Sequence, residues 1–307
     1  MKKPNFFIVG APKCGTTALF TYLGEHPDIY IPETSETLES QLGGKKELHF
    51  FGHDLGFNRP SLEDYLNYYA NANGEQQLGE SSVFYLYSQQ AAEEIKAFNP
   101  DARIIIMLRN PVDMMYSWYS QLLFWGDETL PTFQDALAAE ADRKIGKRLP
   151  IRADHPIECF YYREIAKYTD QVKRYFELFG RDRVHVIIFD DFKQDTAAVY
   201  RDVMQFLECR EAYEPDFRVI NSNKSIRNKL LQSFLRHPPK LIRRLIDALI
   251  PIPVRRIVRQ MLQKYNTQDG ARNVLDAELK AKLQSEFKSE IENLGQLLAL
   301  DLSHWVQ

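Results

Sequence analysis

A glycine-spaced loop near the amino terminus is the part of the sequence whose residue types most clearly predict chemistry. The stretch Gly10-Ala-Pro-Lys-Cys-Gly-Thr-Thr-Ala18 follows an apolar run and precedes a helix-like stretch. Gly10 and Gly15 have the spacing of a phosphate-binding loop, in which backbone N–H groups at a helix N-terminus hold an anion. In nucleoside triphosphatases a lysine follows the second glycine. Here that position is Thr16, and the lysine, Lys13, lies inside the loop.

A second anion-binding position follows the apolar run Arg103–Leu108. The next residue is Arg109, where a magnesium-dependent triphosphatase would be expected to offer an acidic side chain. Pro111 suits the first turn of a helix, which would bring the Ser117 hydroxyl and Arg109 to one phosphate. The two positions together indicate an anion site without a metal ion. Sulfuryl transfer fits such a site, because a sulfuryl group carries less negative charge than a phosphoryl group.

At these residues the chain resembles the sulfotransferase family, from Phe6 to Trp305. Residues 12–19 resemble the family's loop for the 5′-phosphosulfate of 3′-phosphoadenosine 5′-phosphosulfate (PAPS), and residues 103–117 resemble its segment for the 3′-phosphate. The resemblance implies an enzyme that transfers the sulfuryl group of PAPS in line to a hydroxyl or amine, with Lys13 against the oxygen that bridges phosphate and sulfate. The residues that it implies for PAPS binding are Lys13, Cys14, Gly15, Thr16, Thr17, Ala18, Arg109 and Ser117.

Two other classes of protein share these features. A P-loop kinase or triphosphatase would carry the same loop, but Thr16 in place of lysine and Arg109 in place of an acidic residue argue against it. A non-catalytic anion-binding protein of the same fold would not need Lys13, Glu47 and Arg109 together. We therefore expect an enzyme.

Residues 46–51 contain the candidates for the base that removes the acceptor's proton. Lys46-Glu-Leu-His-Phe-Phe51 resembles a segment of the glycan-modifying branch of the family, which implies that Glu47 is the base and that Lys46 contacts the reacting groups. The branch that acts on small molecules uses a histidine, so His49 is the alternative. We expect Leu48–Phe51 to be a strand, on which Glu47 and His49 would share one face.

Later positions bear on the cofactor and on the acceptor. Lys224 and Arg227 lie in a segment that resembles the family's late basic segment, which implies contact with the 3′-phosphate; a solvated basic face is the alternative. Ser81 stands where the glycan branch often carries a lysine, which argues against a glycosaminoglycan acceptor. The acceptor stays open between a carbohydrate, a lipid and a small molecule, and between O- and N-sulfation.

The order of elements predicts an α/β fold that positions these residues. The apolar runs Phe6–Val9, Arg103–Leu108 and Arg183–Phe189 are typical of buried parallel strands. Helix-like stretches begin at residue 18 and cover 62–70, 89–98, 112–123, 165–179, 196–207 and 276–298. This alternation favours a doubly wound parallel sheet of the P-loop type, with helices on both faces and a mainly helical C-terminal part. We expect the loops 33–48 and 124–160 to shape the acceptor pocket.

Composition limits the classes of protein. The chain has 307 residues, 44% of them hydrophobic, which is enough for one large domain over 1–307. A net charge of −3 gives no reason to expect a nucleic-acid partner. The three cysteines cannot form a closed disulfide framework, no metal-ligand cluster is visible, and the first apolar run is too short for a signal segment. We therefore expect a cytoplasmic, metal-independent protein; its oligomeric state is not predicted.

The C-terminal third is basic and helical in pattern. Residues 224–264 carry eleven Lys and Arg residues against one acidic residue, Asp247. Apolar residues recur at helical spacing within 236–262, which suits either packing against the domain or peripheral contact with an anionic membrane. Residues 274–307 are expected to contain a C-terminal helix.

Overall fold

A five-stranded parallel sheet in the order β2-β3-β1-β4-β5 forms the centre of the protein. The computed structural model describes residues 2–32, 47–74, 77–150, 153–209, 213–218, 224–226, 265–269 and 274–306, and positions 254, 258, 261 and 262. The strands are β1 (Phe6–Gly10), β2 (Ile29–Tyr30), β3 (Gln77–Ser81), β4 (Arg103–Leu108) and β5 (Val184–Ile188), with a separate antiparallel pair β6 (Lys224–Ile226) and β7 (Thr267–Asp269). The predicted parallel α/β sheet is confirmed.

Helices follow most of these strands. They are α1 (Thr16–Gly24), α3 (Leu62–Asn67), α4 (Ala91–Phe98), α5 (Pro111–Trp125), α6 (Phe133–Ala138), α7 (Glu140–Lys144), α8 (Tyr162–Ile165), α9 (Tyr168–Phe179), α10 (Phe189–Gln194), α11 (Thr196–Phe206) and α15 (Ala277–Leu298), with 3₁₀ turns η1 (Ile157–Phe160), η2 (Arg181–Arg183) and η3 (Ser303–Val306). The helices that the sequence predicts on described residues are all present, with their ends shifted by a few residues.

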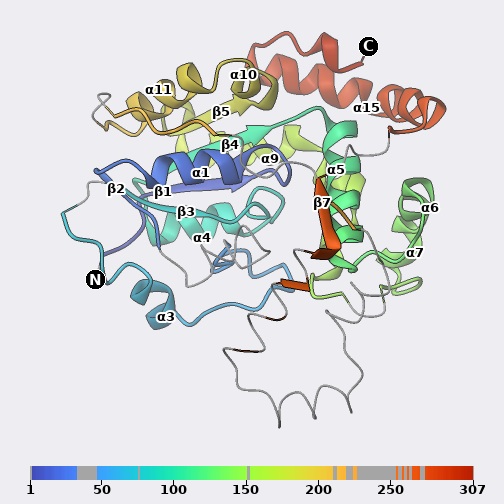
Figure 1. Cartoon of the computed structure of the whole chain (residues 1–307). Coiled ribbons are helices and arrows are strands. Elements are labelled where there is room, and N and C mark those ends of the chain that lie inside the picture. Colours follow the sequence, from blue (N-terminus) through green and yellow to red (C-terminus); the bar gives the residue numbers. More distant parts are fainter. Residues whose placement is uncertain are drawn as a thin grey trace.

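The connections place a ligand crevice between β1 and β4. β1 leads through α1 toward β2, whereas β4 leads through α9 toward β5, in the opposite direction along the sheet. Right-handed crossovers in opposite directions put α1 and α9 on opposite faces, and α1 packs on β1 while α9 packs on β4 and β5 (Figure 1). Such a change of direction opens a crevice at the carboxyl ends of the two strands, where α/β proteins bind ligands.

The central strands are buried on both faces. All five residues of β1 and the last five of β4 are buried, which explains their near-continuous apolar sequence. β3 was not predicted, because it reads Gln-Leu-Gly-Glu-Ser although every residue in it is buried. Its Gly79 lies directly over the Phe6 ring, where an added Cβ would come within 2.2 Å of the ring carbon Cζ.

Two local predictions were wrong. Residues 48–51 form no strand, because His49 has a left-handed backbone with φ of 50° that interrupts the extended run. The region 124–160 is not a loop throughout, since it contains α6, α7 and η1. Thr132 caps α6 by accepting a hydrogen bond from the backbone N–H of Asp135.

Several predictions fall on residues that are not described. These are the loop 33–46, which includes Lys46, and most of 224–264, which includes Arg227 and the helical pattern within 236–262. The membrane contact proposed for that segment therefore stays a prediction. Among the helices that the structure does describe, none is long and apolar enough to cross a bilayer.

Candidate functional site

The loop between β1 and α1 lies at the crevice and is held there by the neighbouring strand. The N–H of Ala11 donates to the carbonyl of Met107 in β4 over 2.7 Å. Lys13 and Gly15 have φ of 63° and 90°, which turn the backbone into α1. Gly15 is the N-cap of α1, and the first turn of that helix carries no acidic residue. The loop thus presents a helix N-terminus that favours an anion.

Lys13 extends from this loop to α5. Its Nζ donates to Oε1 of Gln121 over 2.8 Å. Helix α5 stands at the carboxyl ends of the strands (Figure 1), so the hydrogen bond joins the loop after β1 to the helix after β4. Gln121 lies one helical turn after Ser117 on α5, and nothing in its residue type distinguished it in the sequence.

Cys14 lies in the loop as a packing residue. Its side chain is fully buried, and Sγ donates to the carbonyl of Pro12 over 3.4 Å. Burial raises the pKa of the thiol to about 12, and the nearby charge of Arg109 only partly opposes this. The thiol is therefore protonated at neutral pH and is no nucleophile.

Arg109 leaves the end of β4 beside the loop. Its guanidinium lies 5.1 Å from the ring centroid of Phe189 and its Nη2 lies 3.6 Å from Oδ2 of Asp113. The same Phe189 ring packs against Gly15, where an added Cβ would come within 3.0 Å of it. Phe189 thus contacts both anion-binding positions. Ser117 is buried on α5, two turns beyond Arg109.

The two candidate bases lie together although they share no strand. Oε2 of Glu47 accepts a hydrogen bond from the N–H of Val83 over 3.2 Å and lies 3.6 Å from Nε2 of His49. The His49 ring stacks on Phe57 with centroids 3.9 Å apart. The side chains of Glu47 and His49 are 24% and 15% exposed, so both are partly shielded from water.

Val83 connects Glu47 to the anion loop. Its carbonyl oxygen packs against Gly10, since a Cβ added to Gly10 would lie 2.8 Å from that oxygen. Three residues later, the N–H of Leu86 donates to the carbonyl of Val9 over 2.8 Å. Glu47 is therefore fastened to the backbone segment that touches the start of the loop.

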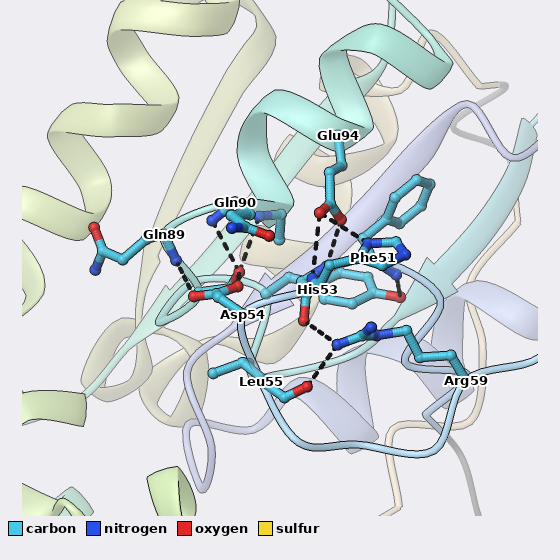
Figure 2. Close-up of polar contacts among 12 residues, drawn as sticks. Phe51, His53, Asp54, Leu55, Arg59, Gln89, Gln90 and Glu94 are labelled. Atoms are coloured by element: carbon cyan, nitrogen blue, oxygen red, sulfur yellow. Dashed lines mark hydrogen bonds and ion pairs between the residues drawn. The ribbon is translucent and has the colours of Figure 1, made fainter. Parts of the chain in front are cut away.

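The chain beyond His49 is anchored on α4 (Figure 2). Glu94 accepts hydrogen bonds from the backbone N–H groups of Gly52 and His53 over 2.6 and 3.2 Å. Asp54 accepts one from the N–H of Gln89 over 2.8 Å, and Arg59 donates to the carbonyl of Gly52 over 2.7 Å (Figure 2). These contacts fix residues 52–59 and hence the position of the candidate bases.

The region 124–160 contributes a histidine, His155, to the surroundings of the candidate bases. Oδ2 of the fully buried Asp127 bonds to Nδ1 of His155 over 2.7 Å. The His155 ring stacks on Trp125 at 4.8 Å, and its centroid lies 6.5 Å from that of Phe57, which stacks on His49. His49, Phe57, Trp125 and His155 form one aromatic surface beside Glu47, and we call it the aromatic patch. Sequence reasoning missed the Asp127–His155 pair because its members lie 28 residues apart with no motif spacing.

Of the two later cofactor residues and the helper that the sequence predicts, only Lys224 lies in the described part of the chain. Lys224 lies in β6, which packs against α5, whereas Arg227 and Lys46 lie outside the described residues. No group of three or more His, Cys, Asp or Glu residues able to hold a metal ion occurs in the described part of the chain. The residues that could hold an anionic nucleotide are the loop, Lys13, Arg109 and Ser117.

Comparisons with known proteins agree with this geometry. The family model described as "Sulfotransferase domain" matches residues 3–232. The crystal structure of a sulfotransferase from Alicyclobacillus acidocaldarius is 30% identical, with a TM-score of 0.72 over 100% of both chains, which confirms the P-loop-like fold. The bifunctional heparan sulfate N-deacetylase/N-sulfotransferase 1 of Mus musculus is 27% identical over 213 residues, 66% of this chain and 22% of that protein. Its counterpart in Xenopus tropicalis is 28% identical over 220 residues, 69% and 23% respectively, so this chain spans less than a quarter of these relatives.

Proposed function

Because this chain belongs to the sulfotransferase family and is an enzyme of that class, we propose that it uses PAPS as the donor and transfers the sulfuryl group in line, without a metal ion, to a hydroxyl or amine. The observation that carries the proposal is the placement of Lys13 and Arg109 directly after the neighbouring strands β1 and β4, with Glu47 bonded to Val83, whose carbonyl packs against Gly10 at the end of β1. PAPS supplies an activated sulfuryl group.

The two cations and the helix N-terminus fit a nucleotide that carries anionic groups at both ends. The backbone N–H groups of residues 15–17 and Lys13 would hold the 5′-phosphosulfate, since Gly15 caps the N-terminus of α1. Arg109 and Ser117 would hold the 3′-phosphate, with Lys224 and Arg227 as further contacts. Lys13 then places positive charge where negative charge grows as the sulfur–oxygen bond breaks, which stabilises the transition state more than the ground state.

Glu47 serves as the base that takes the proton of the acceptor, with His49 as the alternative. Oε2 of Glu47 and Nε2 of His49 lie 3.6 Å apart. The Glu47 carboxylate accepts a hydrogen bond from the Val83 N–H, and the backbone N–H of His49 donates to Oγ of Ser82. A base must be held within hydrogen-bond reach of the proton it removes, and this fixation supplies that.

The acceptor would lie along the aromatic patch. Partly exposed aromatic rings suit the apolar face of a sugar ring, and the names of the two vertebrate relatives refer to heparan sulfate. We propose a carbohydrate as the first class to test. Ser81, where the glycan-modifying branch often has a lysine, favours a sugar less charged than a glycosaminoglycan.

A ligand comparison followed by a transfer assay tests the proposal. The desulfated product 3′-phosphoadenosine 5′-phosphate (PAP) should raise the melting temperature, and ATP with magnesium should not. PAPS labelled in the sulfuryl group should then label an acceptor from a panel of sugars, lipids and phenols, equally well in excess chelator. Stabilisation by ATP with magnesium alone, or transfer that requires magnesium, would contradict the proposal.

A further inference from the structure

A buried carboxylate that the proposed reaction does not use lies at the end of β3. Glu80 is 1% exposed. Its oxygens accept hydrogen bonds from the hydroxyls of Ser82 over 2.9 Å, Tyr85 over 2.5 Å, and Tyr65. Three donors around one carboxylate are what a charged group needs when it is removed from water.

Two of the three hydroxyls also accept hydrogen bonds from the segment that carries the candidate bases. Oγ of Ser82 accepts a hydrogen bond from the N–H of His49 over 3.1 Å. The Tyr85 hydroxyl accepts one from the N–H of Phe51 over 3.2 Å. Each hydroxyl has a single proton, and donating it to Glu80 turns its lone pairs toward these N–H groups. The carboxylate thereby sets the direction of both hydrogen-bond paths.

The third hydroxyl, on Tyr65, gives a contrast inside the same cluster. It bonds to Glu80, while the Tyr65 ring stacks on Phe50 with centroids 4.0 Å apart. Replacing Tyr65 by Phe keeps this stacking and removes a bond to Glu80 without removing a bond to the base segment.

Charge couples Glu80 to the candidate base. Burial raises the pKa of Glu80 to about 7 against the opposing effect of its three hydroxyl donors, and the charge of Glu47 raises it further. Among the described residues, the other titratable groups that face Glu80 are Tyr65, Tyr69 and Tyr85, whose pKa values burial raises well above their usual range, so they stay neutral. Because repulsion is mutual, an ionised Glu80 favours protonation of Glu47.

We propose that Glu80 is a positioning residue that holds Glu47 and His49 over the crevice through the hydroxyls of Ser82 and Tyr85, and that its negative charge makes Glu47 a stronger base. The proposal rests on the proposed function for the role of Glu47. Turnover should then rise as the pH rises through about 7, where Glu80 ionises.

Four variants separate this role from a structural one. Glu80→Gln should lower kcat by roughly 10- to 100-fold and remove the limb near neutral pH, while PAP affinity stays unchanged. Ser82→Ala and Tyr85→Phe should each lower kcat by roughly 3- to 10-fold. At pH values above the limb, kcat of Tyr65→Phe should stay within about twofold of wild type, while the limb shifts to higher pH, because the Tyr65 hydrogen bond lowers the pKa of Glu80. An equal loss in all four variants, or an unchanged pH limb in Glu80→Gln, would overturn the proposal.

Amide hydrogen exchange gives a readout without activity. Exchange at His49 should accelerate in Ser82→Ala, at Phe51 in Tyr85→Phe, and at both in Glu80→Gln, with the melting temperature recorded as a control for folding. Unchanged exchange at both amides in Glu80→Gln overturns the positioning role whatever the activity. If exchange accelerates in these variants but the wild-type protein transfers no sulfuryl group, the positioning role is supported and the proposed function is refuted.

Discussion

Lys13 supplies the positive charge that the proposed reaction needs at the breaking sulfur–oxygen bond. It lies inside the loop rather than at the start of α1, and its backbone is left-handed with φ of 63°. Its ammonium group donates a hydrogen bond to the neutral side-chain amide of Gln121 on α5, so this contact orients the ammonium group without neutralising it. Such a charge, fixed in advance, acts on a developing negative charge without reorganisation.

Replacing Lys13 by Ala should therefore affect turnover more than nucleotide binding. We expect kcat to fall by roughly 100-fold or more, and the Kd for PAP to rise by less than about tenfold, because PAP lacks the breaking bond. Steady-state kinetics and calorimetry measure the two. Gln121→Ala is the control, since it removes the orienting contact and keeps the charge. Near wild-type turnover in Lys13→Ala would exclude the role.

Glu47 and His49 differ in what each can lose. Glu47→Gln keeps the shape and can still accept the Val83 N–H, but it cannot take a proton, so kcat should fall by roughly 100-fold at unchanged PAP affinity. His49→Asn should cost less, because it removes mainly the stacking on Phe57. Both kcat values should be measured with a hydroxyl and an amine acceptor. If His49→Asn abolishes turnover and Glu47→Gln does not, the base is His49.

At the scale of elements, the parts predicted from sequence are those whose pattern is local. β1 is apolar along its whole length, and β4 is apolar after Arg103, because helices cover both faces; each strand ends in a loop that carries a cation. β3 escaped prediction because three of its five residues are polar although all are buried; Glu80, for example, accepts a hydrogen bond from the distant Tyr65. Leu48–Phe51 has the composition of a strand, and only the backbone turn at His49 shows otherwise.

The same distinction holds for the candidate site. The loop and Arg109 were predictable because their residue types and their place after a strand are visible in the sequence. Gln121, Phe189 and Glu80 were not, because each acquires its role from a contact with a segment far away in the chain. Ordinary glutamine, phenylalanine and glutamate residues carry no spacing that would single them out.

The region 124–160 should influence the acceptor rather than the nucleotide. His155 is oriented by the buried Asp127 and belongs to the aromatic patch. The contacts described above for His155 involve neither Lys13 nor Arg109. His155→Ala should raise the KM for the acceptor by roughly tenfold and leave the Kd for PAP unchanged, since truncation removes an oriented polar and aromatic contact. Thr129→Ala, an exposed change in the same region, is the control. An equal change in both constants would place His155 elsewhere in the mechanism.

At the scale of the whole molecule, Trp305 near the C-terminus forms hydrogen bonds with the segment proposed for the 3′-phosphate and with α10. The carbonyl of Trp305 in η3 accepts a hydrogen bond from Nδ2 of Asn110 over 2.8 Å, and its Nε1 donates to Oδ2 of Asp190 over 2.9 Å. Asn110 follows Arg109 and caps α5, and Asp190 follows the Phe189 that packs against Arg109. Helix α15 and η3 lie beside α10 in Figure 1.

Trp305→Phe tests this closure, because it keeps an aromatic ring in a buried position and removes the indole donor to Asp190. The loss of one buried hydrogen bond should cost about 1 kcal/mol of unfolding free energy, measured by urea titration. Affinity for PAP should fall by roughly 3- to 10-fold, since the segment that holds Arg109 loses a support. Affinity for adenosine 5′-phosphosulfate, which lacks the 3′-phosphate, should stay within about twofold.

His304→Ala is the matched control. The His304 side chain is 52% exposed and lies 3.6 Å from the same carboxylate oxygen, so its loss should change the affinity for neither nucleotide. If Trp305→Phe weakens both nucleotides equally, the C-terminal turn supports the whole fold rather than the 3′-phosphate segment.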